Sequence, residues 1–304
     1  MGRAMQPTQR PMFALVLRLL AMAVISVMLL LVKLTGERGL WLTETLFWRQ
    51  FLPGVALFGW LAARGEIGRL RTSRPWIHAR RAFIGGTGMF LTLGVVQILP
   101  LAEATVLGFT APIFAVLLAV VLLGERVGPW RWTAVVLGLA GVVIIAGPDR
   151  AHIPLVGLAT GIGAAFMVAL ISIQLRDLGR TEEPVSIVFW FSAFCTPPLS
   201  LFVIWTGIPH HDLAEWAMLF GIGATGLAAQ LLMTAALRYG SVASVIVMDY
   251  SQFGWATLWG WLVFANVPSA QTWIGAPAII AAGLIIAWRE QVRGGPVAPR
   301  PPAA

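Results

Sequence analysis

Charged residues are scarce in this chain: Asp, Glu, Lys and Arg make up only 11% of its 304 residues, against about a quarter in an ordinary soluble domain. Apolar residues make up 58% of the sequence. So few charges cannot coat a soluble fold of this size, and so apolar a composition is not that of an intrinsically disordered chain. The class that remains is a multi-spanning helical membrane protein.

Cysteine is almost absent, because Cys195 is the only one. One thiol cannot form an internal disulfide or a cysteine metal cluster, which excludes a disulfide-stapled secreted domain. Cys195 lies inside an apolar stretch, so we expect a small buried core residue.

Enzyme signatures are missing as well, since the chain contains no H-E-x-x-H, P-loop or G-x-S-x-G sequence. Gly221–Gly226 matches G-x-G-x-x-G, but it lies in an apolar stretch, where glycines serve close helix contact. We therefore predict no catalytic residues, no resident metal and no cofactor. Without a nucleotide-binding motif, any uphill transport must draw on ion or solute gradients.

Apolar stretches of about 20 residues, the length that crosses a bilayer as a helix, recur along the chain. Gly, Pro and charged residues separate them, as expected of turns and water-facing loops. The sequence therefore predicts an all-α integral membrane protein with ten transmembrane helices. Their expected ranges are 12–34, 43–63, 81–99, 102–123, 130–147, 154–175, 185–206, 214–237, 241–264 and 272–288.

The positive charges indicate how these helices are oriented. Net charge is +8, which in a soluble domain would suggest nucleic acid, but here the basic residues occupy short loops that face anionic lipid. With a cytoplasmic N-terminus, sixteen of the 21 Lys and Arg residues fall in inward-facing segments and three in outward-facing ones. We therefore predict a bacterial inner-membrane protein with both termini cytoplasmic, residues 291–304 forming a disordered cytoplasmic tail.

A weak internal repeat divides the chain. Phe109–Leu117 aligns with Tyr250–Leu258 at an offset of 141 residues, with aromatic, hydroxyl, Ala and Leu positions coinciding. We predict a first five-helix repeat over 1–150 and a second over 151–290. Because five is odd, the second repeat inserts upside down, and inverted repeats are typical of secondary transporters that alternate around a site at mid-depth.

Motifs in both halves resemble those of the drug/metabolite transporter superfamily, EamA type. They are Leu99–Thr105, Ala111–Phe114 and Leu123–Arg126 in the first half, and Ala235–Tyr239, Met248–Tyr250 and Trp255–Ala256 in the second. The resemblance covers nearly the whole chain and implies ten helices in two inverted halves that carry small organic solutes. One departure is that the second half has Ala265-Asn266 where the family often has Gly-Glu, which favours a loop role for Glu125.

Ionisable residues inside a span are costly, about 2.5–3.5 kcal/mol each, and normally face a cavity or a partner. Asp249 is the strongest candidate, since it lies about 12 Å along its span and is too short to reach the headgroups. It would bind a cationic group or a proton, or else fix helix packing. Arg49 would contact a substrate carboxylate or form a structural ion pair, while Arg18 is close enough to the cytoplasmic surface that we expect it to reach the headgroups.

Amides and aromatic rings complete the predicted site. Buried amides must find hydrogen-bond partners, either in a polar cavity or between helices. Aromatic rings would form an apolar wall beside a flat solute or simply pack in the core. The substrate-binding residues that we predict are Asp249, Tyr250, Trp255, Gln230, Gln97, Arg49, Phe109 and Phe166. His210 and His211, in an outer loop, would bind a metal weakly or, as we expect, be solvated.

These observations favour a secondary transporter that moves small organic metabolites, amino acids or related compounds, by alternating access. Its expected partners are a small-molecule substrate and membrane lipids, with a proton as the candidate coupling ion and no nucleic acid. An uptake carrier for a vitamin, a nucleoside-like or a quaternary-amine solute is the alternative. A passive channel is a further rival. An intramembrane lipid-modifying enzyme would need a second catalytic group beside Asp249, and none lies at suitable spacing.

Overall fold

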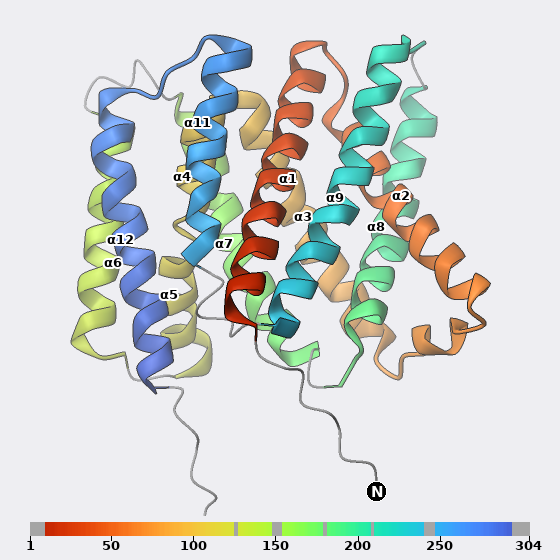
Figure 1. Ribbon diagram of the computed structural model, residues 1–304, viewed down its shortest axis with the longest axis horizontal. Coiled ribbons are helices and arrows are strands. Elements are labelled where there is room, and N and C mark those ends of the chain that lie inside the picture. The colour runs from red at the N-terminus through yellow and green to blue at the C-terminus, as the bar shows by residue number, and fades with distance from the viewer. Residues whose placement is uncertain are drawn as a thin grey trace, which may run out of the picture.

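The computed structural model describes residues 10–124, 127–147, 154–178, 181–207, 210–239 and 247–293, which form helices and no strands, as predicted (Figure 1). Outside these residues lie 294–304 of the tail predicted over 291–304, the start of the ninth span over 241–246, and Glu125. Residues 291–293 of the predicted tail are helical instead. The helices are α1 (Pro11–Glu37), α2 (Leu42–Ala63), η1 (Ile67–Leu70), α3 (Pro75–Ile98), α4 (Leu101–Gly108), α5 (Ala111–Leu123), α6 (Pro129–Ala146), α7 (Leu155–Leu178), α8 (Pro184–Thr206), α9 (Leu213–Tyr239), η2 (Val247–Tyr250), α11 (Ser251–Phe264) and α12 (Ala270–Arg293).

Proline and glycine set many of the helix ends. A proline stands in the first turn of α1, α3, α5, α6 and α8, where its missing N–H has no helical partner to lose. Gly124 ends α5 with a φ of 63°, a left-handed conformation that glycine adopts without steric cost.

Most of these helices satisfy the requirements for crossing a membrane. Within the described residues, eight segments are long and apolar enough, with α4 and α5 counted as one path. α2 has 22 residues but carries several polar side chains, among them Glu44, Arg49 and Gln50. α11 has only 14 described residues and is preceded by η2.

The fourth predicted span is broken at its centre. The hydropathy predicts one helix over 102–123, whereas α4 ends at Gly108 and α5 begins at Ala111. Pro112 explains the break, because proline has no N–H to donate to the carbonyl of Gly108, four residues earlier. The ninth span changes from a 3-10 helix to an α-helix after Tyr250. This is the residue that the 141-residue offset pairs with Phe109, so the two irregularities occur at equivalent points.

The helix contacts have the symmetry of two repeats. α1 packs against α9 as α7 packs against α3, and α1 meets α11 as α7 meets α5. The pairs α2–α8 and α6–α12 each join equivalent helices. In Figure 1, α6 and α12 lie at one end of the long axis and α2 and α8 at the other. The described chain therefore has an approximate two-fold relation between its halves.

Both described ends of the chain lie on one face of the bundle. α1 begins and α12 ends at the bottom of Figure 1. We call this the terminal face and the opposite one the far face. An even number of crossings places both ends on one side, in agreement with ten spans.

The close approach of α6 and α12 depends on glycine. A Cβ at Gly275 would lie 2.6 Å from the carbonyl oxygen of Gly141, which is backbone and cannot move aside. We predict that Gly275→Ala lowers the stability of the folded protein by about 1–3 kcal/mol through overpacking. Thermal unfolding in detergent, followed by tryptophan fluorescence, measures the change.

Gly59→Ala is the matched control, because nothing lies within 4 Å of a Cβ at that helical position. It should leave the melting temperature unchanged or raise it slightly, since alanine favours the helix. Equal melting temperatures for Gly275→Ala and the parent would show that α6 and α12 do not pack this closely.

Candidate solute cavity

A cavity of about 390 Å³ lies between the two halves of the bundle. This volume is within the range of small-molecule sites, about 300–1,000 Å³. On α1 it extends from Arg18 to Leu29, which are about 10 and 27 Å along the helix from its first residue. The cavity is therefore at mid-depth, as the inverted repeat predicts. Its lining includes residues of α1, α3, α4, α5, α7, α9, η2, α11 and α12.

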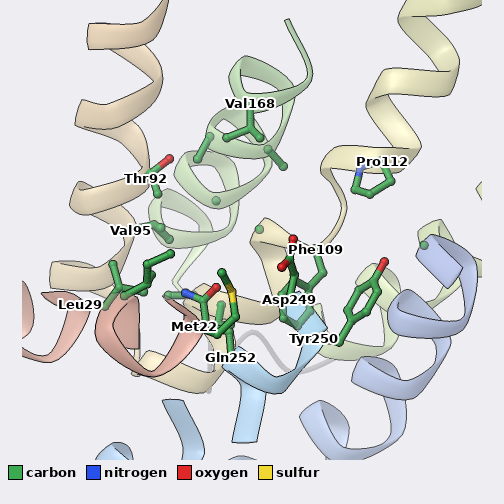
Figure 2. A pocket seen from close by; sticks show the side chains of 18 of the residues that line it. Met22, Leu29, Thr92, Val95, Phe109, Pro112, Val168, Asp249, Tyr250 and Gln252 are labelled. Atoms are coloured by element: carbon green, nitrogen blue, oxygen red, sulfur yellow. The ribbon is translucent and has the colours of Figure 1, made fainter. Parts of the chain in front are cut away.

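The two helix irregularities meet in this cavity. Phe109 follows α4, Tyr250 ends η2, and their rings lie edge to face with centroids 5.0 Å apart. Figure 2 shows them beside Asp249, with Thr92 and Val95 on another side of the cavity. The repeat-equivalent aromatic residues therefore form one surface where the two halves join.

An ion pair joins the halves at the same place. Arg18 on α1 donates from Nε to Oδ1 of Asp249 at 2.5 Å and from Nη2 to Oδ2 at 2.6 Å. The Arg18 side chain is 8% exposed and that of Asp249 is 29% exposed, toward the cavity. Two parallel hydrogen bonds of this kind fix both the position and the orientation of the carboxylate.

The rest of the lining is uncharged. Apart from Arg18 and Asp249, the described residues around the cavity are apolar or neutral. Thr92, Thr105 and Gln252 supply its polar side chains, and the Thr105 hydroxyl has no hydrogen-bond partner in the described structure. The cavity thus combines one neutralised ion pair, an aromatic surface and a few neutral polar side chains.

Of the eight predicted site residues, Asp249, Tyr250 and Phe109 line the cavity. The other five lie outside its lining. Gln230 is exposed on α9 and Trp255 is half-buried on α11. Phe166 meets Phe114 edge to face, the side chain of Gln97 lies against Gly36, and Arg49 contacts Met89 of α3.

The sequence analysis did not place Arg18 in the site. The prediction that Arg18 reaches the lipid headgroups is wrong, because its guanidinium is buried against Asp249. The sequence did hold a signal for this pair. A lone carboxylate at mid-depth requires a cation, and Arg18 and Asp249 lie at similar depths from the terminal face. Gln252 and Thr92 carried no comparable signal.

A second polar cluster lies at the far face. His211, in the loop before α9, binds Glu44 of α2 from Nε2 at 2.6 Å and Glu215 of α9 from Nδ1 at 3.2 Å. The His211 side chain is 2% exposed, so the expectation of a solvated loop is wrong for this residue, although His210 is exposed. Among the described side chains no grouping suited to a metal ion is found. This cluster ties the first half of the chain to the second.

Comparison with known proteins gives consistent matches over most of the chain. The sequence pattern of the EamA-like transporter family matches residues 11–147 and again 155–288. A riboflavin transporter of Rhizobium johnstonii is 29% identical over 81% of each chain. A pseudopaline exporter of Pseudomonas aeruginosa is 28% identical over 88% of this chain and 93% of its own.

Two further matches agree with these. An S-adenosylmethionine uptake transporter of Rickettsia bellii is 28% identical over 82% of this chain and 84% of its own. A crystal structure matches 94% of this chain and 99% of its own with a TM-score of 0.63 and 21% identity, which supports the fold.

The far-face cluster has a pH dependence with a definite sign. Burial disfavours protonated His211, but the hydrogen bonds and charges of Glu44 and Glu215 outweigh it and raise the pKa of His211. A raised folded pKa stabilises the protein fully below the ordinary value of about 6.5, and this contribution is lost as pH rises through the folded value. We predict a melting temperature that falls as pH rises above about 6.5.

His211→Gln should remove most of this pH dependence, whereas His210→Gln, at an exposed neighbouring position, should retain it. Melting curves at constant ionic strength across this pH range measure the effect. The same slope in His211→Gln and the parent would assign the pH dependence to other groups.

Proposed function

This chain belongs to the EamA-like transporter family, within the drug/metabolite transporter superfamily, and we propose that it carries metabolites with a zwitterionic head group by alternating access. Membership makes the protein a multi-pass membrane transporter of small molecules rather than an enzyme, built as two inverted repeats of five helices. The proposal concerns the class of solute and the residues that bind it.

The single observation that carries the proposal is the neutralised pair in the cavity. Arg18 and Asp249 are the charged side chains in the described lining, and each is the other's partner. A solute with one charge would leave one of them unpaired in a poorly solvated site, which is costly. A solute with an ammonium and a carboxylate can pair with both, the ammonium with Asp249 and the carboxylate with Arg18. Amino acids and related metabolites have this head group.

The aromatic surface supports a second candidate. Phe109 and Tyr250 form an apolar wall beside the ion pair, and aromatic rings favour flat partners in stacked or edge-to-face contact. A neutral, flat vitamin-like solute would use this wall and leave Arg18 paired with Asp249. The relative named as a riboflavin transporter supports testing this class.

Transport would follow from the inverted halves. We infer repeats over 1–150 and 151–290, with a cytoplasmic tail over 291–304, that exchange inward and outward conformations around the central cavity. The excess of arginine on the segments of the terminal face supports placing that face in the cytoplasm of a bacterium and the bundle in its inner membrane. Asp249 is also the site that we propose for a coupling proton, because protonation would release Arg18.

Substitution of the pair tests the proposal. Asp249→Asn and Arg18→Gln should each reduce solute counterflow into proteoliposomes at least tenfold, because each removes one contact with the head group and leaves the other charge unpaired. A melting screen of amino acids, nucleosides, vitamins and quaternary amines identifies the solute to be assayed. Removal of one partner costs about 3 kcal/mol of stability, so inserted protein must be quantified.

Arg38→Gln is the matched control, because its ion pair with Asp212 lies exposed on the far face. It should transport like the parent. If Asp249→Asn and Arg18→Gln also transport like the parent, the ion pair does not bind the solute. If only neutral flat solutes stabilise the parent, the vitamin-like class replaces the zwitterionic one.

A further inference from the structure

A second group of buried charges lies outside the cavity, where α2, α3 and α8 pack together. Arg49 and Gln50 come from α2, Arg81 from α3 and Cys195 from α8. Both guanidinium groups interact electrostatically with the Cys195 thiol, and the Gln50 side chain lies within hydrogen-bonding range of its sulfur, a weak acceptor. None of these four residues lines the central cavity.

Arg81 reaches into the protein rather than toward water. It is in the second turn of α3, and its Nη1 lies over Gly85, one turn deeper along the helix. Helical side chains lean toward the N-terminus by default, and in this helix that direction leads back to the terminal face. Arg81 instead stacks on Phe191, with Cζ 4.5 Å from the ring centroid, and is 8% exposed.

The donors of this group lack acceptors. Nε and Nη1 of Arg81, Nε of Arg49 and Nε2 of Gln50 are all buried without a hydrogen-bond partner in the described structure. Nη1 of Arg49 donates to Oε1 of Gln50 at 3.1 Å and lies 2.6 Å from the sulfur of Met89, a weak acceptor.

No carboxylate among the described residues pairs with either arginine. Glu182 lies close to His78, one turn before Arg81, but it accepts a hydrogen bond from Thr72 at 2.7 Å and is 3.6 Å from the His78 imidazole. Cys195 donates to the carbonyl oxygen of Ala82 at 3.4 Å. The group therefore holds two positive charges and several free N–H donors without a negative charge of its own.

We propose that Arg49, Gln50 and Arg81 form a binding site for a small monovalent anion between α2, α3 and α8. A guanidinium remains protonated in a protein interior, and an uncompensated charge at membrane depth is expensive. The planar N–H donors of a guanidinium match the two oxygens of a carboxylate, and the Gln50 amide adds a further donor. The anion is either free in solution or the carboxylate of a solute, and the site is separate from the cavity that contains Arg18 and Asp249.

Melting of the intact protein in detergent tests this site at constant ionic strength. Sodium gluconate is the reference salt, because its hydroxylated six-carbon chain makes this carboxylate too bulky for a small-anion site between packed helices. Sodium chloride and sodium acetate are the anions that we would titrate. A bound anion stabilises the folded state in proportion to the logarithm of its concentration above the dissociation constant. The parent should melt several degrees higher in chloride or acetate than in gluconate. Stabilisation by both anions indicates a site for free anions, and stabilisation by acetate alone indicates a site for a carboxylate group.

Arg81→Gln should lose this response, and in gluconate it should melt at or above the parent temperature, because it removes an uncompensated charge. Gly85→Ala keeps the charge but displaces Arg81, so it should weaken the response. Arg38→Gln, which removes an exposed arginine, should respond like the parent.

Two results would overturn the proposal. One is an absence of stabilisation by either anion in the parent. The other is an equal response in Arg81→Gln, which would assign the effect to general salt action. Loss of stability of Arg81→Gln in gluconate, together with no anion response in the parent, would make Arg81 a packing residue.

Discussion

A charge inside a bilayer must be neutralised, and the pairing of Arg18 with Asp249 meets this requirement in the central cavity. The pair joins the first helix of one half to the ninth span of the other, beside the point where a 3-10 turn becomes an α-helix. It also leaves the cavity without net charge among its described lining residues. The same interaction therefore stabilises the contact between the halves and restricts which solutes can enter without leaving a charge unpaired.

The broken helices explain why this site is at the junction of the repeats. A proline that interrupts the fourth span and a change of helix type in the ninth occur at equivalent positions, so the approximate two-fold relation brings Phe109 against Tyr250. Irregular backbone at membrane depth is tolerated where it is buried in protein or lines a cavity. The cavity thus lies where the fourth span breaks and the ninth changes helix type.

The sequence could predict the helical class, the inverted repeat and three of the residues that line the cavity, because hydropathy, repeat offset and the cost of a buried carboxylate are local signals. It could not predict which side of a helix faces inward. Gln230 and Met233 both lie on α9, yet Met233 reaches the cavity and Gln230 is exposed. For the same reason His211 could not be paired with Glu44 and Glu215, since a basic side chain near a helix end can reach either water or the interior.

The requirement for neutrality also separates the two groups of buried arginines. Arg18 forms two hydrogen bonds with the Asp249 carboxylate, so its charge is neutralised without a ligand. Arg49 and Arg81 lie beside a thiol and an amide that offers further N–H donors, so their region lacks a negatively charged acceptor among the described side chains. Because charged arginine cannot become neutral there, the missing negative charge must come from outside the described side chains. The charges of Arg18 and Asp249 neutralise each other, whereas those of Arg49 and Arg81 have no negative partner among the described side chains. We therefore expect this bundle to bind ligands at more than one place.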